Sequence, residues 1–180
     1  IQSEPCYEGM TGGWSPFYGS RAECTSYLAR MQGWISMLSG AAGYVYGADG
    51  LYYADNWNAL SFPGSSAVGY MKNFFVARPQ WWLMTPTLDC VSIDGVTLVY
   101  DNMSHPRCAG IAGSFYAAYL PDGISGTVRF KNIVNGTYRA QWYNPRTGDY
   151  TTINNALSVN GQWGIPGRPD GSDWVIILEK

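Results

Sequence analysis

The feature that most constrains the fold is a change in hydrophobic periodicity near residue 85. Before it, apolar residues recur at helical spacing, as at Leu28, Met31, Ile35 and Leu38. After it, apolar and polar residues alternate, as in residues 127–143. Because helical spacing indicates amphipathic helices and alternation indicates half-buried strands, the sequence predicts two domains, residues 1–84 and residues 85–180.

The first domain follows the order strand, helix, strand, helix. The expected strands are residues 1–7 and 42–48, and the expected helices are residues 21–38 and 65–77, the second with Ser65 as its N-cap. Two βα units bury too little surface to stand alone, and a parallel sheet needs neighbouring strands. We therefore expect residues 1–84 to be the last two βα units of a (β/α)8 barrel, incomplete in this chain.

The second domain has the pattern of an antiparallel β structure. The alternation places Val128 and Phe130 on one face and Arg129 and Lys131 on the other. The segment "DWVIILEK" reads as a strand buried on both faces, and Pro-Asp-Gly and Asn-Gly turns separate the short strands. These features predict a small antiparallel β-sandwich that can fold alone. The expected fold class is thus α/β followed by all-β.

Charge and composition restrict the partners. The formal net charge is -2, and no apolar run approaches the roughly 18 residues of a membrane span. We therefore expect neither nucleic acid nor a membrane as partner. Aromatic residues make up 16% of the chain and charged residues 13%. Such a composition is typical of secreted proteins that handle neutral sugars, because rings stack on sugar faces while amides and hydroxyls bond to hydroxyl groups.

The cysteines and two sequons indicate an extracellular protein. The spacings suggest Cys6–Cys24 and Cys90–Cys108 disulfides, although four cysteines allow three pairings, and reduced cysteines are the alternative. Each bridge would close a loop of about 18 residues, a stabilisation of about 3 kcal/mol in the chain-entropy model. Asn102 and Asn135 lie in Asn-x-Ser/Thr sequons and are candidate glycosylation sites. Together these features favour secretion.

Several motifs resemble one family of enzymes. The segments "EPCYEG", "GAAGYVYG", "WNALSFPG" and "RPQWWLMTP" occur in this order. They resemble the C-terminal half of the catalytic domain of the apiosidase-like glycoside hydrolases, whose catalytic domain is a (β/α)8 barrel. The tail, from "AAYLPDG" through "WYNPRTGDY" to "DWVIIL", resembles the small β-domain, labelled collagen-binding, that follows the barrel in that family.

The resemblance implies a secreted retaining glycosidase that acts on plant or microbial polysaccharide side chains. It assigns the nucleophile to Glu4, in the "EPCYEG" segment. The position suits this role, because barrel active sites form at the carboxyl ends of the strands. In a retaining enzyme the nucleophile and the acid/base lie about 5–5.5 Å apart. The alternative is that Glu4 is a surface acid.

Other residues near the same strand ends are candidates for substrate binding: Tyr7, Glu8, Trp14, Tyr46, Asp49 and Trp57. Glu8 could bond to a substrate hydroxyl, orient Glu4 or be solvated. Trp14 and Trp57 are candidate stacking platforms, with core packing as the alternative for Trp14. Trp81, Trp82, Trp142 and Trp174 are assigned instead to packing between the barrel part and the sandwich, or to a core.

The second catalytic carboxylate has no candidate that matches the family. In such barrels it comes from an earlier strand, and Asp49 and Asp55 are the nearby acids. We therefore expect an N-terminal barrel segment, in this polypeptide or in a separate chain, to supply the acid/base and to be a partner of residues 1–84.

Two other hypotheses stay open. In one, the β-domain is a non-catalytic module that binds carbohydrate or a matrix protein. In the other, the chain is a structural protein without a ligand. No dinucleotide fingerprint is present, and His105 is the single histidine, so neither a cofactor nor a metal is expected.

Overall fold

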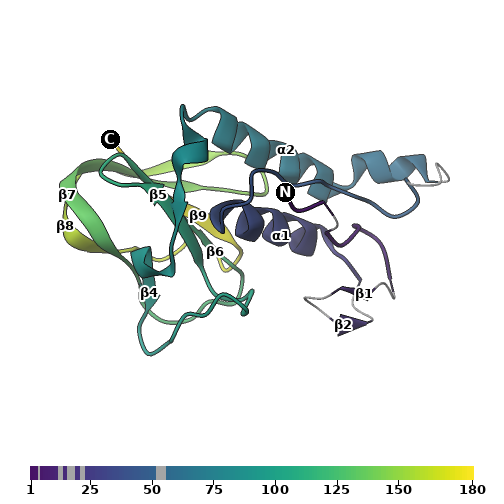
Figure 1. Cartoon of the computed structure of the whole chain (residues 1–180), viewed down its shortest axis with the longest axis horizontal. Coiled ribbons are helices and arrows are strands. Elements are labelled where there is room, and N and C mark those ends of the chain that lie inside the picture. The colour runs from purple at the N-terminus through teal and green to yellow at the C-terminus, as the bar shows by residue number, and fades with distance from the viewer. Residues whose placement is uncertain (4, 12–13, 16–18, 21–22, 52–55) are drawn as a thin grey trace. The chain divides into compact units, whose positions relative to one another are not determined.

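The computed structural model describes residues 1–3, 5–11, 14–15, 19–20, 23–51 and 56–180, with the backbone alone at residues 14–15 and 19–20. The chain divides into two compact units (Figure 1). Unit 1 comprises Ile1–Met37, Ala41–Pro79 and Arg146–Gly148, and unit 2 comprises Leu38–Gly40, Gln80–Pro145 and Asp149–Lys180.

Unit 1 contains the two long helices. Its described elements are β1 (Trp14–Ser15), β2 (Gly19–Ser20), α1 (Ser26–Leu38), the 3-10 helix η1 (Trp57–Ser61) and α2 (Pro63–Val76). Both predicted helices are therefore present, although α1 begins five residues later than expected. The antiparallel pair β1–β2 was not predicted.

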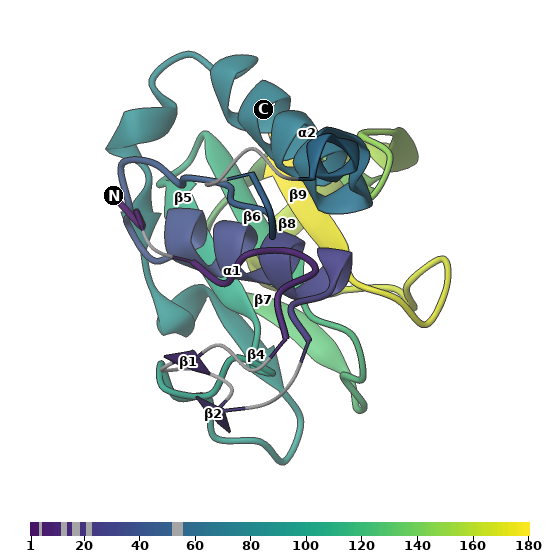
Figure 2. The same ribbon diagram turned by 90° about the vertical axis from the view of Figure 1, so that its right-hand side faces the viewer.

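The two segments predicted as parallel strands lie side by side in unit 1 (Figure 2). Among the described residues they are joined by isolated parallel bridges, Gln2 to Tyr44 and Glu8 to Ala48, rather than by a continuous ladder. On the first segment the two bridged residues, Gln2 and Glu8, are six positions apart. On the second segment Tyr44 and Ala48 are four positions apart. Residues 2–8 thus carry two more residues than the segment they pair with, which interrupts the ladder.

The helices of unit 1 share an aromatic core. Trp34 of α1 is fully buried, and its ring meets Phe74 of α2 edge-on at 4.9 Å between centroids. Phe75 is also buried and lies 5.6 Å from the Trp34 ring. Such edge-to-face pairs add to the free energy gained from burial alone.

The start of α2 differs from the prediction. Ser65 is not the N-cap: the cap residue is Phe62, with an extended backbone, and Pro63 occupies the first helical position. Proline suits this position, because its fixed φ is helical and its missing N–H would have had no helical acceptor. The Ser65 hydroxyl bonds to the Leu60 carbonyl instead.

Unit 2 is a mostly antiparallel sheet. Its strands are β3 (Thr85–Pro86), β4 (Val91–Ile93), β5 (Arg107–Ile111), β6 (Phe115–Leu120), β7 (Val128–Tyr143), β8 (Tyr150–Gly164) and β9 (Trp174–Glu179), with the 3-10 helices η2 (Trp81–Leu83) and η3 (Leu88–Cys90) before β4. The order is β3-β5-β6-β9-β7-β4, with β8 paired to β7. The described strands of unit 2 thus form one hydrogen-bonded sheet.

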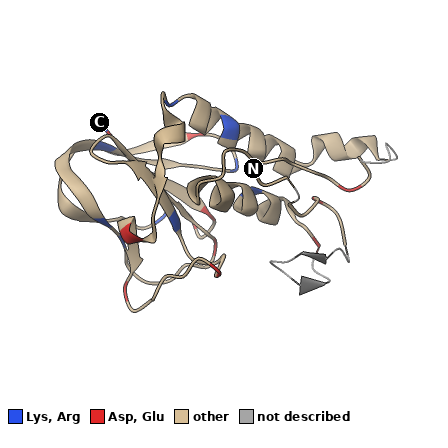
Figure 3. Cartoon of the chain, in the orientation of Figure 1, with Lys and Arg blue, Asp and Glu red and all other residues tan. Residues whose placement is uncertain are grey.

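The predicted buried face of β7 is confirmed, because Val128 and Phe130 are buried while Arg129 is exposed. Further along the same strand Tyr138, Ala140 and Trp142 are also buried. β9 is buried from Trp174 to Leu178, as its apolar sequence indicates. β8 contains no charged residue, and charges are sparse elsewhere (Figure 3).

The two predicted disulfides are present. Cys6 is bonded to Cys24, with 5.9 Å between the Cα atoms, and Cys90 to Cys108, with 6.2 Å. Each lies within one unit. None of the helices in the described part of the chain has the length and apolar character that a membrane crossing needs.

Candidate functional site

The candidate site is built where the two parallel segments end. The N–H of Glu8 donates to the carbonyl of Gly47 at 3.0 Å, and the N–H of Asp49 donates to the carbonyl of Glu8 at 2.8 Å. The two segments therefore end next to each other, and the loops that follow them begin at Gly9 and Asp49. In parallel α/β folds, catalytic groups gather at this end of the strands.

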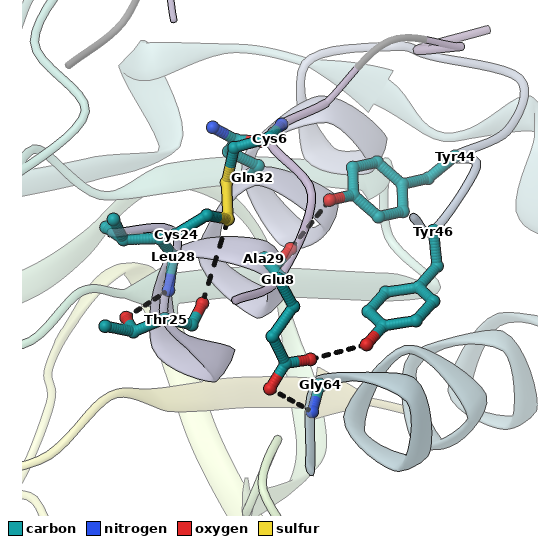
Figure 4. The surroundings of a disulfide bond; sticks show 10 residues. All are labelled: Cys6, Glu8, Cys24, Thr25, Leu28, Ala29, Gln32, Tyr44, Tyr46 and Gly64. Atoms are coloured by element: carbon teal, nitrogen blue, oxygen red, sulfur yellow. Dashed lines mark hydrogen bonds between the residues drawn. A yellow bond between two sulfur atoms is a disulfide. The ribbon is translucent and has the colours of Figure 1, made fainter. Parts of the chain in front are cut away.

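The carboxylate of Glu8 is the best-defined polar group at this end (Figure 4). Its side chain is buried, with the residue 5% exposed. The Tyr46 hydroxyl donates to Oε2 at 2.6 Å, and the N–H of Gly64 donates to Oε1 at 3.2 Å. Glu8 is therefore not solvated, which contradicts that alternative for its role.

Tyr46 stays a neutral donor in this environment. Burial raises the pKa of its phenol, and the hydrogen bond to Glu8 and the charge of that carboxylate raise the pKa further. A phenol held neutral next to a carboxylate donates a short, charge-assisted hydrogen bond. This bond ties the segment before Asp49 to the segment that contains Tyr7.

Two glycines leave room for this arrangement. A Cβ atom on Gly64 would overlap Oε2 of Glu8, and a Cβ atom on Gly47 would overlap the ring of Tyr7. Gly64 lies in the first turn of α2, where N–H groups lack helical acceptors and the helix dipole favours negative charge. A side chain at Gly47 would force the two segments apart, and one at Gly64 would displace the Glu8 carboxylate from α2.

α1 holds the same segments from the other side (Figure 4). Oε1 of Gln32 accepts the N–H of Cys6 at 3.0 Å, and the Tyr44 hydroxyl donates to the carbonyl of Ala29 at 2.8 Å. Because Cys6 is also bonded to Cys24, the first segment is fixed by a covalent and a polar contact. The backbone around Tyr7 and Glu8 is thereby positioned by three elements.

The structure brings some of the predicted site residues together. Tyr7, Glu8 and Tyr46 form one group, and Asp49, which is exposed, follows directly. Trp57 starts η1 with 66% of its surface exposed, as a stacking platform requires. Glu4 and Asp55 lie outside the described residues, as does the side chain of Trp14.

The remaining predicted residues lie elsewhere. Trp142 and Trp174 are buried and pack together in unit 2, with ring centroids 6.1 Å apart. Trp82 is 66% exposed. Asn102 and Asn135 are both exposed. Among the described residues, no three metal-ligating side chains cluster.

Of the two residues that donate hydrogen bonds to the Glu8 carboxylate, Tyr46 and Gly64, the sequence did not indicate Gly64. It lies 56 residues from its partner, so local patterns do not reveal the contact. The Phe-Pro-Gly sequence that starts α2 is the signal that could have indicated it, because a glycine in a first helical turn often allows close approach of another group.

Comparison with known proteins gives a match in each half of the chain. Residues 1–82 match the family model of the apiosidase-like catalytic domain. The resemblance seen in the sequence is confirmed. Beyond this apiosidase-like region, residues 97–179 match the model described as "Putative collagen-binding domain of a collagenase". A search of the curated proteins gives no match.

Solved structures share the fold. One, titled a glycoside hydrolase, superposes with a TM-score of 0.76 at 20% identity, over 98% of this chain and 41% of its own length. A glycoside hydrolase family 5 protein from Bacteroides vulgatus gives 0.73 at 19% identity, over 98% of this chain and 40% of its own. The chain thus spans about two fifths of the structures that it matches.

Proposed function

We propose that this chain is the C-terminal portion of a secreted retaining glycoside hydrolase that acts on polysaccharide side chains. The observation that carries the proposal is the parallel pairing at Glu8 and Ala48, within the region that matches the apiosidase-like catalytic domain. This pairing is what the end of a (β/α)8 barrel requires. Two disulfides, one in each unit, favour an oxidising compartment.

In this proposal Glu4 is the nucleophile. It attacks the anomeric carbon and forms a covalent glycosyl-enzyme, while an acid/base protonates the leaving oxygen and then activates water. The acid/base comes from a barrel segment outside these 180 residues. Tyr7, Asp49 and Trp57 contact the sugar, and Trp57 supplies an exposed ring for stacking.

The test uses the polypeptide that contains both this chain and the rest of the barrel. Glu4→Gln is expected to lower turnover of 2,4-dinitrophenyl glycosides at least about a thousandfold, because a removed nucleophile leaves only binding and electrostatic stabilisation. Glu23→Gln is the matched control, since Glu23 is an exposed acid of the same unit. Near-full activity of Glu4→Gln would contradict the proposal.

A second measurement locates the nucleophile directly. A 2-deoxy-2-fluoro glycosyl fluoride slows release of the covalent intermediate, so it should label the peptide that contains Glu4. A label on another carboxylate would overturn the assignment while leaving the retaining mechanism intact. Inverted product stereochemistry would overturn the mechanism itself.

A further inference from the structure

A cavity of about 540 Å³ lies in unit 2 and has no role in the proposed hydrolysis. Its walls are residues of the β6–β7 loop and the β8–β9 loop, with the strand ends next to them. The volume falls within the range of about 300–1,000 Å³ that is usual for small-molecule sites. The cavity is therefore large enough for a small organic ligand.

Part of the lining is aliphatic. Leu120, Val128 and Ile165 line the cavity and are buried in the core of the unit. These side chains offer no hydrogen bond, so they favour a ligand face that carries C–H groups. A sugar ring has such a face between its hydroxyl groups.

Arg168 is fixed in the wall of the cavity. Its Nη1 donates to the carbonyls of Pro121 and Ser172, at 2.9 and 2.7 Å, and its Nη2 donates to the carbonyl of Ile124 at 3.1 Å. A guanidinium has five N–H groups. Two of them, on Nε and Nη2, therefore have no acceptor among the described residues, although the side chain is already immobilised.

Asp170 lines the same cavity and is fixed as well. Its Oδ1 accepts the N–H of Ser172 at 2.9 Å and the indole N–H of Trp174 at 2.7 Å. The cavity thus presents a donor-only cation and an acceptor-only anion. An anionic ligand would be repelled by Asp170, and a cationic ligand by Arg168. A hydroxyl group both donates and accepts, so it satisfies either side chain.

We propose that this cavity binds a neutral mono- or disaccharide, with ring hydroxyls on Arg168 and Asp170 and a C–H face on the aliphatic residues. Gly167 and Gly171 line the cavity, and a Cβ added at either position would meet no atom within 4 Å. The binding needs neither Glu4 nor any other part of unit 1.

The test is an NMR titration of the full ¹⁵N-labelled chain. The probes are xylose, arabinose, galactose, glucose and cellobiose, with glucuronate as an acidic counterpart and a triple-helical Gly-Pro-Pro peptide as a protein-type ligand. At least one neutral sugar is expected to shift the indole N–H signal of Trp174 and the amides of both loops. Glucuronate is expected to bind more weakly than glucose.

Two variants examine the site. Gly167→Leu adds a side chain to the lining of the cavity and should weaken sugar binding about tenfold, as should Asp170→Ala through the lost acceptor. Gly69→Leu is the matched control, because a Cβ on Gly69 also meets no atom within 4 Å but lies in α2. The spectra report directly whether each variant is folded.

Four outcomes would overturn the proposal. In the first, no neutral sugar shifts the signals of the loops at any concentration. In the second, glucuronate binds more tightly than glucose, and in the third only the triple-helical peptide shifts the loop signals. In the fourth, the folded Gly167→Leu variant binds sugar with unchanged affinity.

Discussion

At the scale of single residues, one buried arginine organises a loop of unit 2. Arg107 is 1% exposed. Its Nη2 donates to the carbonyls of Tyr100 and Asn102, at 2.6 and 3.1 Å, and its Nη1 donates to that of His105 at 3.1 Å. The loop before β5 therefore folds around one guanidinium. Burial lowers the pKa of this group.

Arg107→Lys is expected to destabilise the protein by about 2–4 kcal/mol, because an ammonium group cannot reach the same carbonyls and a buried donor set is lost. The measurement is the free energy of unfolding in urea. The control is Arg129→Lys, whose pair with Asp94 at 3.3 Å is exposed. This change should alter stability by less than about 0.5 kcal/mol. Equal effects of the two variants would contradict the role of Arg107.

The bond between Tyr46 and Glu8 predicts a dependence on alkaline pH. Tyr46→Phe should cost about 1.5–3 kcal/mol at pH 7, as expected for a hydrogen bond to a charged group. The pKa of Tyr46 is raised in the folded chain, and an unfolded tyrosine ionises near pH 10. The stabilisation is therefore complete below about pH 10 and is lost as the pH rises above it.

Urea unfolding at several pH values would check this prediction. The difference between the original protein and Tyr46→Phe should shrink between about pH 10 and 12. A difference that stays constant over this range would show that the phenol contributes through packing rather than through its proton.

At the scale of elements, the start of α2 joins a helix to the end of two strand segments. Gly64 and Gly69 lie in this same helix but in different surroundings. A Cβ on Gly64 would overlap the Glu8 carboxylate, whereas one on Gly69 would meet nothing within 4 Å. Substitutions at these two glycines therefore measure different effects. A change at Gly69 reports helix propensity alone, whereas a change at Gly64 also reports the contact with Glu8.

Gly69→Ala should stabilise the protein by about 0.5–1 kcal/mol, the usual gain from replacing a helical glycine. Gly64→Ala should destabilise it by about 1–3 kcal/mol, because the carboxylate must move and lose its hydrogen bonds. Thermal unfolding of both variants checks the pair. Stabilisation by both changes would mean that the contact between Glu8 and Gly64 does not constrain the start of α2.

The elements could be predicted from sequence where the pattern is local and repeated. The alternation from Val128 to Trp142 gave the buried face of β7, and the helical spacing up to Leu38 gave the end of α1. The start of α2 was misplaced because Ser65 is a common N-cap residue, while Pro63 already satisfied the steric requirement of the first turn.

Contacts between distant segments could not be predicted in this way. Tyr46 and Gly64 lie 38 and 56 residues from Glu8, and nothing in the local pattern distinguishes a buried carboxylate from a solvated one. Likewise, Arg168 and Asp170 read as an ordinary polar loop. Their meeting at one cavity depends on the β6–β7 loop, more than 40 residues earlier in the chain.

At the scale of the whole molecule, the two units differ in how their backbones are paired. Unit 2 has a continuous antiparallel sheet, in which β9 pairs with β6 and β7. In unit 1 the described parallel segments are joined by two isolated bridges. Backbone amides exchange slowly where the hydrogen bonds belong to a cooperative core.

Hydrogen exchange should therefore be slow in β6 and β9 and much faster at residues 2–8. If a further barrel segment completes unit 1 as proposed, adding it should slow exchange at residues 2–8 without affecting β9. The measurement is exchange followed by mass spectrometry. Equal protection of both regions in the chain alone would show that unit 1 is already a complete core.

The two disulfides have a consequence for the covalent continuity of the chain. Each bridge spans 18 residues, and no bridge links the sequence before Cys24 to the sequence after Cys90. A single protease cut between them would yield two fragments that separate on a denaturing gel without reductant. A cut between Cys6 and Cys24 would yield fragments that stay together until reductant is added. The polypeptide between Cys24 and Cys90 is thus the sole covalent connection between the two disulfide-closed loops.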